Sequence, residues 1–134
     1  MPDAPLEAEL LGANRRLLDA IARGDWAGYA ELCADSLTAF EEESRGQLVA
    51  GLDFHRFYFE LPTIERGGPT ARTEMIAPHV RVLGPDAGVV SYVRLVQSID
   101  VEGVPVTSRS EETRVWQRID GRWRHVHFHR SSSD

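Results

Sequence analysis

The sequence predicts an α+β fold in which N-terminal helices pack on one face of a curved antiparallel sheet. Apolar residues recur with a helical period in the first part of the chain, and with a period of two in the C-terminal part. A strong hairpin signal, Asp120-Gly121, separates the last two predicted strands. The 134 residues fit a single domain, 1–134, and we expect flexible ends at 1–5 and 132–134.

The first predicted helix carries one apolar stripe and can end at Gly24. Asp25 is a candidate N-cap for a second helix over 26–34, because its carboxylate can accept the free N–H groups of a first helical turn. The stripe of the first helix consists of Leu10, Leu11, Leu17, Leu18 and Ile21.

Three further segments precede the predicted meander. Residues 36–44 are typical of a short strand that runs into an acidic turn, and residues 48–61 favour a third helix that ends at Pro62. Residues 62–73 are polar and rich in Gly and Pro, which predicts a loop.

Four segments with a period of two complete the sheet: 73–84, 87–100, 104–119 and 122–130. Both faces of the segment 87–100 are largely apolar, whereas a sheet covered on one side alternates apolar with polar residues. We therefore expect a second subunit to cover the outer face, with Val93 and Leu95 in the interface. The alternative is that one helix wraps around to that face.

All basic residues are arginines, and three of them, Arg94, Arg114 and Arg130, lie on different predicted strands among apolar neighbours. If they face the helices, three guanidinium groups enter the space between helices and sheet. A buried, unpaired charge costs several kcal/mol, roughly, so this cluster needs partners. Those partners are either internal carboxylates, from Glu112 and the acidic turn 41–43, or a small anion held by bidentate contacts.

The tail "RWRHVHFHR" contains three histidines at alternate positions. Strict alternation predicts that Val126, Phe128 and Arg130 face inward. Three histidines in a line span too far for one metal ion, and no obvious carboxylate lies beside them, so we expect no metal or other cofactor. The residues predicted to face outward, where the histidines meet another subunit, are Trp123, His125, His127 and His129.

Composition excludes several classes. A net charge of −6 argues against nucleic acid as a partner, and no apolar run is long enough to span a membrane. The N-terminus is unlike a secretory signal, which makes a cytoplasmic location the expectation. Cys33 is the only cysteine, so a disulfide framework within one chain is excluded. The absence of lysine excludes Lys-dependent kinase chemistry.

Five short motifs appear in order and at matching spacing: "GLDFHRFYFE", "PHVRVLG", "SEETRVW", "DGRW" and "VHFHRS". They resemble the association (hub) domain of calcium/calmodulin-dependent protein kinase II, and the similarity runs over about 17–131. We expect a stand-alone version from a bacterium. No kinase domain precedes the motifs, so a kinase is not expected.

The resemblance implies the cone-shaped fold of the nuclear transport factor 2-like superfamily. It also implies self-association into dimers through the sheets, and possible stacking of dimers into rings. Finally, it implies a pocket that accepts small carboxylates. The positions that match this pocket are Arg94, Arg114 and Arg130, with His55 at its edge. Tyr92, which shares a strand face with Arg94, is a further candidate for ligand binding.

The expected function is therefore a non-catalytic oligomerisation domain with an arginine-lined pocket for a small anion. The alternative is a small enzyme, like the ketosteroid isomerases, dehydratases and polyketide cyclases of that superfamily, acting on a small acid. Three arginines would depress the pKa of nearby carboxyl groups and weaken a general base. The weak catalytic candidates are His55, Asp53, Tyr58 and Glu112.

Overall fold

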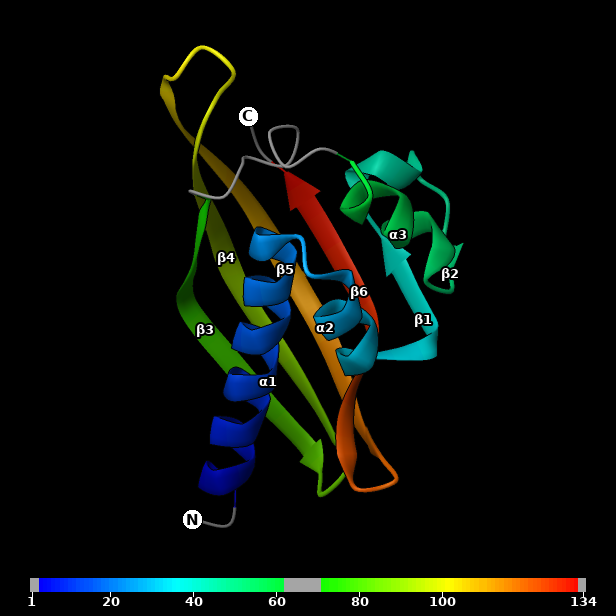
Figure 1. The fold of residues 1–134 in the computed structure, drawn as a ribbon. Helices are drawn as coiled ribbons and strands as arrows, with labels where there is room; N and C mark the ends of the chain where they lie inside the picture. Colours follow the sequence, from blue (N-terminus) through cyan, green and yellow to red (C-terminus); the bar gives the residue numbers. More distant parts are fainter. Residues whose placement is uncertain (1–2, 62–70, 133–134) are drawn as a thin grey trace.

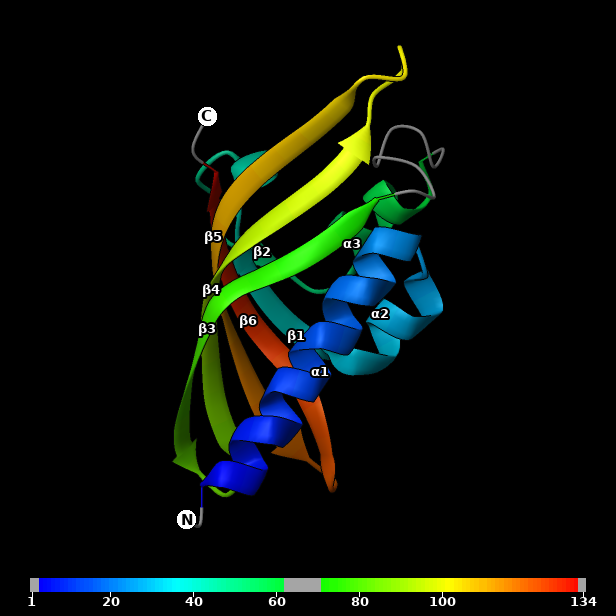
Figure 2. The ribbon, with the colours of Figure 1, turned by 90° about the vertical axis from the view of Figure 1, so that its left-hand side faces the viewer.

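Helices cover one face of a six-stranded sheet in the computed structural model, which describes residues 3–61 and 71–132 (Figure 1). The other face of the sheet carries none of the described helices (Figure 2). This arrangement confirms the α+β class. In chain order the elements are α1 (Ala4–Arg23), α2 (Trp26–Leu32), β1 (Cys33–Phe40), the 3-10 turn η1 (Glu42–Ser44), β2 (Val49–Ala50), α3 (Asp53–Phe59), β3 (Arg72–Gly84), β4 (Ala87–Ile99), β5 (Pro105–Ile119) and β6 (Arg122–Ser132).

The ends of α1 and α2 follow the predicted signals. Gly24 adopts φ 67°, and its N–H reaches the carbonyls of Ala20 and Ile21, which closes α1. The Asp25 side chain accepts a hydrogen bond from the Gly28 N–H at 3.0 Å and so caps α2. No described helix is long and apolar enough to cross a membrane.

Several element boundaries differ from the predicted ones. Cys33 begins β1 instead of continuing α2, and α3 is shorter than 48–61 because β2 occupies its first part. Regular structure also extends into the ends predicted to be flexible: Ala4 starts α1 and Ser132 ends β6. The predicted loop 62–73 lies mostly outside the described residues, and Arg72 already belongs to β3.

The sheet order is β2-β1-β6-β5-β4-β3. Strands β3 to β6 form the predicted antiparallel meander, and Asp120 and Gly121 have φ of 53° and 77° in the turn between β5 and β6. One junction departs from the antiparallel prediction, because β1 runs parallel to β6. The chain enters β1 from α2 and not from a hairpin, so no local turn determined this direction.

A bulge in β6 corrects the predicted facing of the tail. Val115 pairs with His127 while Trp116 pairs with His125, which leaves Val126 as an extra residue. The bulge reverses the alternation before it, so His125 faces the helices and is fully buried, contrary to the prediction. Trp123 also faces inward, and its Nε1 donates to Glu9 of α1 at 2.8 Å. Beyond the bulge, Phe128 and Arg130 face inward as predicted.

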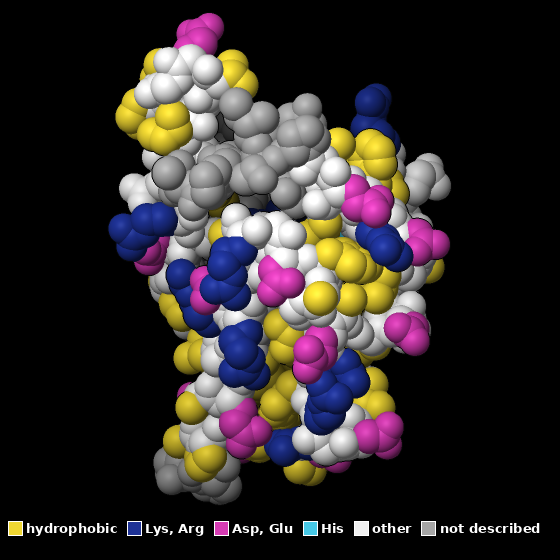
Figure 3. All heavy atoms as spheres, viewed as in Figure 1, with side chains coloured by type: hydrophobic (Ala, Val, Ile, Leu, Met, Phe, Trp, Pro, Cys, Tyr) yellow, Lys and Arg dark blue, Asp and Glu magenta, His cyan; other side chains and the backbone are white. Residues whose placement is uncertain are grey.

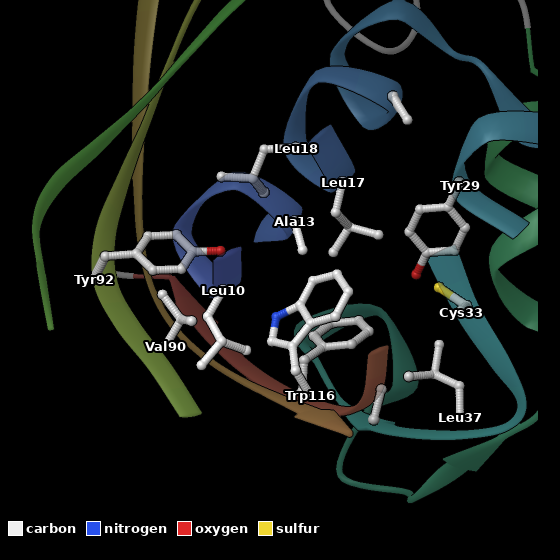
Figure 4. Close-up of a cluster of buried hydrophobic side chains, with 13 residues drawn as sticks. Leu10, Ala13, Leu17, Leu18, Tyr29, Cys33, Leu37, Val90, Tyr92 and Trp116 are labelled. Atoms are coloured by element: carbon white, nitrogen blue, oxygen red, sulfur yellow. The ribbon is translucent and has the colours of Figure 1, made fainter. Parts of the chain in front are cut away.

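The core lies between α1 and the sheet (Figure 4). Leu10, Leu17 and Leu18 of α1 meet side chains of β4 and β5, among them Val90 and Trp116. The Trp116 Nε1 donates to the Asn14 Oδ1 at 2.9 Å, which satisfies both groups where water is absent. Tyr29, Cys33 and Leu37 extend the core toward β1 (Figure 4).

Candidate binding site

A cavity of about 450 Å³ lies between the helices and the inner faces of β4, β5 and β6. Arg94, Arg114 and Arg130 all contribute to its wall, one from each of these strands, and His55 of α3 lies opposite them. The inward alternation of β4 and β5, and of β6 beyond its bulge, brings the three arginines together. The structure therefore gathers these four predicted site residues around one space.

Two of the arginines share a single carboxylate. The Arg114 Nη2 donates to the Glu112 Oε1 at 2.9 Å, and the Arg94 Nη1 donates to its Oε2 at 2.9 Å. The Tyr92 hydroxyl donates to the Glu112 Oε1 at 2.6 Å and accepts from the Arg114 Nε at 2.9 Å. The Arg114 guanidinium also stacks on Phe128, 4.3 Å from the ring centroid.

These contacts fix the charge of the buried groups. Burial alone would raise the pKa of Glu112, but the cations of Arg114 and Arg94 hold that pKa well below its usual range. Burial opposes the charge of Arg114 too, yet Glu112 raises the pKa of this guanidinium above its ordinary value. Each of these two groups therefore favours the ionised form of the other.

Arg130 contacts two other carboxylates. Its Nη2 lies 3.5 Å from the Glu41 Oε1 and also forms a close ion pair with Glu43. The Glu41 Oε2 in turn lies 2.6 Å from the His55 Nε2. Burial raises the pKa of Glu41, but its hydrogen bond to His55 and the Arg130 cation outweigh this and lower the pKa below its usual value.

The carboxylates of the acidic turn differ in their exposure to solvent. The Glu41 side chain is 6% exposed, whereas that of Glu43 is 39% exposed. Ser44 holds the turn, because its hydroxyl donates to the Glu41 carbonyl at 2.7 Å and accepts from the Glu41 N–H. One carboxylate is thus fixed under the turn and another lies at the mouth of the cavity.

Three buried polar atoms in the cavity wall have no hydrogen-bond partner among residues 3–61 and 71–132: the His55 Nδ1, the Thr73 Oγ1 and the Arg94 Nε. Buried polar groups are normally paired, so such atoms indicate a place for water or a polar ligand. Thr73 is not among the site residues predicted from the sequence, because it stands where the predicted loop 62–73 meets the predicted strand 73–84. The period of two in β3, read back from Met75, would have placed it inward.

Of the remaining predicted site residues, some line the cavity and others do not. Tyr58 lines the cavity, but Tyr92 is not among the lining residues, because its hydroxyl lies between Glu112 and Arg114. Asp53 is exposed in the first turn of α3, away from the cavity. The Glu112 oxygens are occupied by the contacts described above. The acid–base pair in the cavity wall is therefore His55 with Glu41, a partner that the enzyme alternative had not included.

The outer face of the sheet holds four of the five predicted interface residues. The His127 Nδ1 lies 2.7 Å from the Thr38 Oγ1, and the Phe40 ring packs beside His127 and His129. A shallow groove next to these histidines is bordered by Ser91, Val93, Glu111 and Thr113, and Val93 and Leu95 project on the same side of β4.

The described residues contain no group of three side chains that could hold a metal ion.

His125 is the exception. Its Nδ1 lies 3.6 Å from the Cys33 Sγ, and its Nε2 lies 3.4 Å from the Arg114 Nη1. Burial and the neighbouring Arg114 cation lower the pKa of His125 well below its ordinary value. His125 therefore belongs to the core behind the cavity and not to an interface.

Comparison with known proteins gives one family. The family model described as "Calcium/calmodulin dependent protein kinase II association domain" matches residues 6–134. The delta subunit of calcium/calmodulin-dependent protein kinase type II from the rabbit Oryctolagus cuniculus is 47% identical over 125 residues. That match covers 93% of this chain and 23% of the rabbit protein, so the chain spans about a quarter of that relative.

Solved structures agree. The association domain of the kinase from C. elegans superimposes with a TM-score of 0.91 at 39% identity, covering 98% of each chain. A nuclear transport factor 2-like protein from Salmonella enterica has a TM-score of 0.79 at 20% identity, covering 98% of this chain and 93% of the other. The second match shows the fold alone and confirms the predicted nuclear transport factor 2-like architecture.

Proposed function

Because the chain belongs to the association-domain family of calcium/calmodulin-dependent protein kinase II, we propose that it is a self-associating, hub-like module whose cavity binds a small carboxylate or similar anion. The cytoplasmic location and the lack of nucleic-acid and membrane partners stay predictions. Self-association and anion binding rest on different observations and are tested separately.

Self-association is supported by the outer face of the sheet. The described helices all lie on the inner face, so none of them wraps around to cover the other (Figure 2). Val93 and Leu95 project from β4, next to the edge strand β3, and Ile76 of β3, which pairs with Val93, is 42% exposed. Neighbouring apolar side chains on an uncovered sheet face are typical of an interface, and a second copy presents a matching surface.

A charge on the outer face of β4 tests self-association. Val93→Asp should reduce the oligomer to monomers, because an unpaired carboxylate in an apolar interface costs several kcal/mol, roughly. Native mass spectrometry and light scattering report the mass. Phe57→Asp is the matched control, since Phe57 is 58% exposed on α3, away from the sheet face. An unchanged mass in Val93→Asp would disprove this interface.

Anion binding is supported above all by the polar atoms of the cavity wall that have no hydrogen-bond partner within residues 3–61 and 71–132. Thr73 offers a hydroxyl and Arg94 an N–H in the wall of the cavity that Arg114 and Arg130 also line. Arginine recognises carboxylates with paired, charge-assisted hydrogen bonds. A small acid with a second polar group fits this set of donors best.

The wild-type chain should bind acetate, and Arg130→Gln should weaken that binding about tenfold, because a charge-assisted hydrogen bond contributes about 1.5–3 kcal/mol. Titration followed by NMR chemical shifts measures the dissociation constant. Arg72→Gln provides the control, since Arg72 is exposed and paired with Glu74 on β3. If acetate binds no better to the wild type than to Arg130→Gln, the cavity is not an anion site.

A further inference from the structure

The charges around the cavity form two groups of opposite balance. Arg94 and Arg114 share Glu112, which leaves one surplus positive charge on the β4–β5 side. Arg130 is shared by Glu41 and Glu43, which leaves one surplus negative charge on the β6 side when His55 is neutral. These groups therefore cancel when His55 is neutral. The fourth arginine of the cavity wall, Arg109, lies 3.6 Å from the Glu111 carboxylate, so it adds no surplus charge and an incoming anion meets a site that is already neutral.

The three carboxylates differ in their freedom to move. The Glu112 side chain is fully buried between two arginines and a tyrosine hydroxyl. Glu41 is 6% exposed and lies against His55. Glu43 is 39% exposed, and its ion pair with Arg130 is the only contact of its carboxylate among the interactions described above. Among these three, only Glu43 can turn into solvent without leaving a buried charge unpaired.

From this difference we propose that the Glu43 carboxylate is a displaceable internal ligand, which occupies the anion position on Arg130 and must turn away when an external anion binds. The inference rests on the proposed anion site and adds its regulation. Glu43 lines the same cavity as Arg130, and the η1 turn that carries it is held through Ser44 and not through the Glu43 side chain. Displacement can therefore proceed by a change of side-chain rotamer while the turn persists.

The Glu43 carboxylate weakens the binding of every external anion, because each anion must replace the existing ion pair between Glu43 and Arg130. It also favours anions that offer more than one carboxylate oxygen or a second polar group. Such ligands regain contacts with Thr73 and Arg94 that Glu43 does not make. Glu43 is thus a specificity-determining residue as well as a barrier.

The test compares two substitutions in one turn. Glu43→Gln should tighten acetate binding about fivefold relative to the wild type, because the amide keeps the shape of the side chain but no longer pairs with Arg130. Glu42→Gln removes the same charge from a neighbouring exposed residue that does not line the cavity, and acetate binding should stay within about twofold. NMR titration of the full chain measures both.

A second readout follows the displaced group directly. In the wild type, saturating acetate should move the carboxyl carbon resonance of Glu43 toward that of a solvent-exposed glutamate, while the resonance of Glu41 changes less. If the wild type and Glu43→Gln bind acetate equally well, the proposed displacement of Glu43 is wrong, whereas the proposed anion site is supported. If both substitutions tighten binding equally, the effect is one of overall charge and the proposal is wrong. If neither the wild type nor Glu43→Gln binds acetate, the proposed anion site itself is wrong.

Discussion

Arg114 belongs to the core and to the cavity wall at once. Its side chain is 2% exposed and holds Glu112, Tyr92 and the Phe128 ring in place. The sequence left internal carboxylates and an external anion open as partners of the arginines, and the structure contains the internal ones. Removing Arg114 would disturb a buried ion pair and therefore the fold. Arg130, at the edge of the cavity, is the better position for a binding test.

His125 should make the fold sensitive to mild acid. Its pKa in the folded state lies well below the ordinary value, whereas the unfolded chain takes up this proton near pH 6.5, roughly. Its contribution to stability is thus fully present above about pH 6.5 and is lost as the pH falls below that value. In urea unfolding between pH 7 and pH 5, the free energy of unfolding should decrease by up to about 1.4 kcal/mol per pH unit from this residue.

The slope with pH identifies the residue responsible. His125→Asn should make the curve flatter between pH 7 and pH 5, whatever its effect on absolute stability. His79→Gln removes an exposed histidine from β3 and should leave the slope unchanged. A slope that is equal in the wild type and in His125→Asn would contradict the proton linkage.

At the scale of elements, the close contact between α1 and β4 depends on Gly88. A Cβ at this position would lie 2.3 Å from the Leu10 Cδ1 and 3.3 Å from the Arg81 carbonyl oxygen. Leu10 is fully buried in the core, so a shift of its side chain has to be accommodated by its packed neighbours. The absence of a side chain on one strand therefore sets how deeply the helix sits against the sheet.

Two identical substitutions in α1 and β4 should have opposite effects. Gly88→Ala should lower the free energy of unfolding by about 1–3 kcal/mol, because it overpacks the contact with Leu10. Gly12→Ala should raise it by about 0.5–1 kcal/mol, since an added Cβ there meets nothing closer than 3.5 Å and alanine favours the helix. Chemical denaturation measures both.

The same measurement in a Leu10→Ala background isolates the contact. The cost of Gly88→Ala should then fall below 1 kcal/mol, roughly, because the clashing methyl group is gone. A cost that stays the same in both backgrounds would show that the strand backbone, and not Leu10, is the obstacle.

At the scale of the whole molecule, the two faces of the sheet have different tasks. The inner face bears the core and the cavity. The outer face presents Val93, Leu95, His127 and His129 to the proposed second copy. On the helical side, basic and acidic side chains are interspersed (Figure 3). The loss of assembly expected for Val93→Asp belongs to this scale, because one charge on one face separates subunits while the cavity on the other face is retained.

The sequence by itself determined the class of fold, the order of most elements and the identity of the three cavity arginines. These follow from periods of hydrophobicity, from turn and cap residues, and from motifs with fixed spacing, all of which act over a few residues. The inward positions of Arg94 and Arg114 were predictable because β4 and β5 keep their alternation on either side of them.

Only the tertiary structure decided which charges meet and which way His125 points. The bulge at Val126 arises from the pairing of β6 with β5, and the parallel placement of β1 beside β6 joins segments about ninety residues apart. Glu41 and Glu43 reach Arg130 through that placement. The free energy of such pairings depends on packing over the entire sheet, so no local pattern in the sequence encodes them.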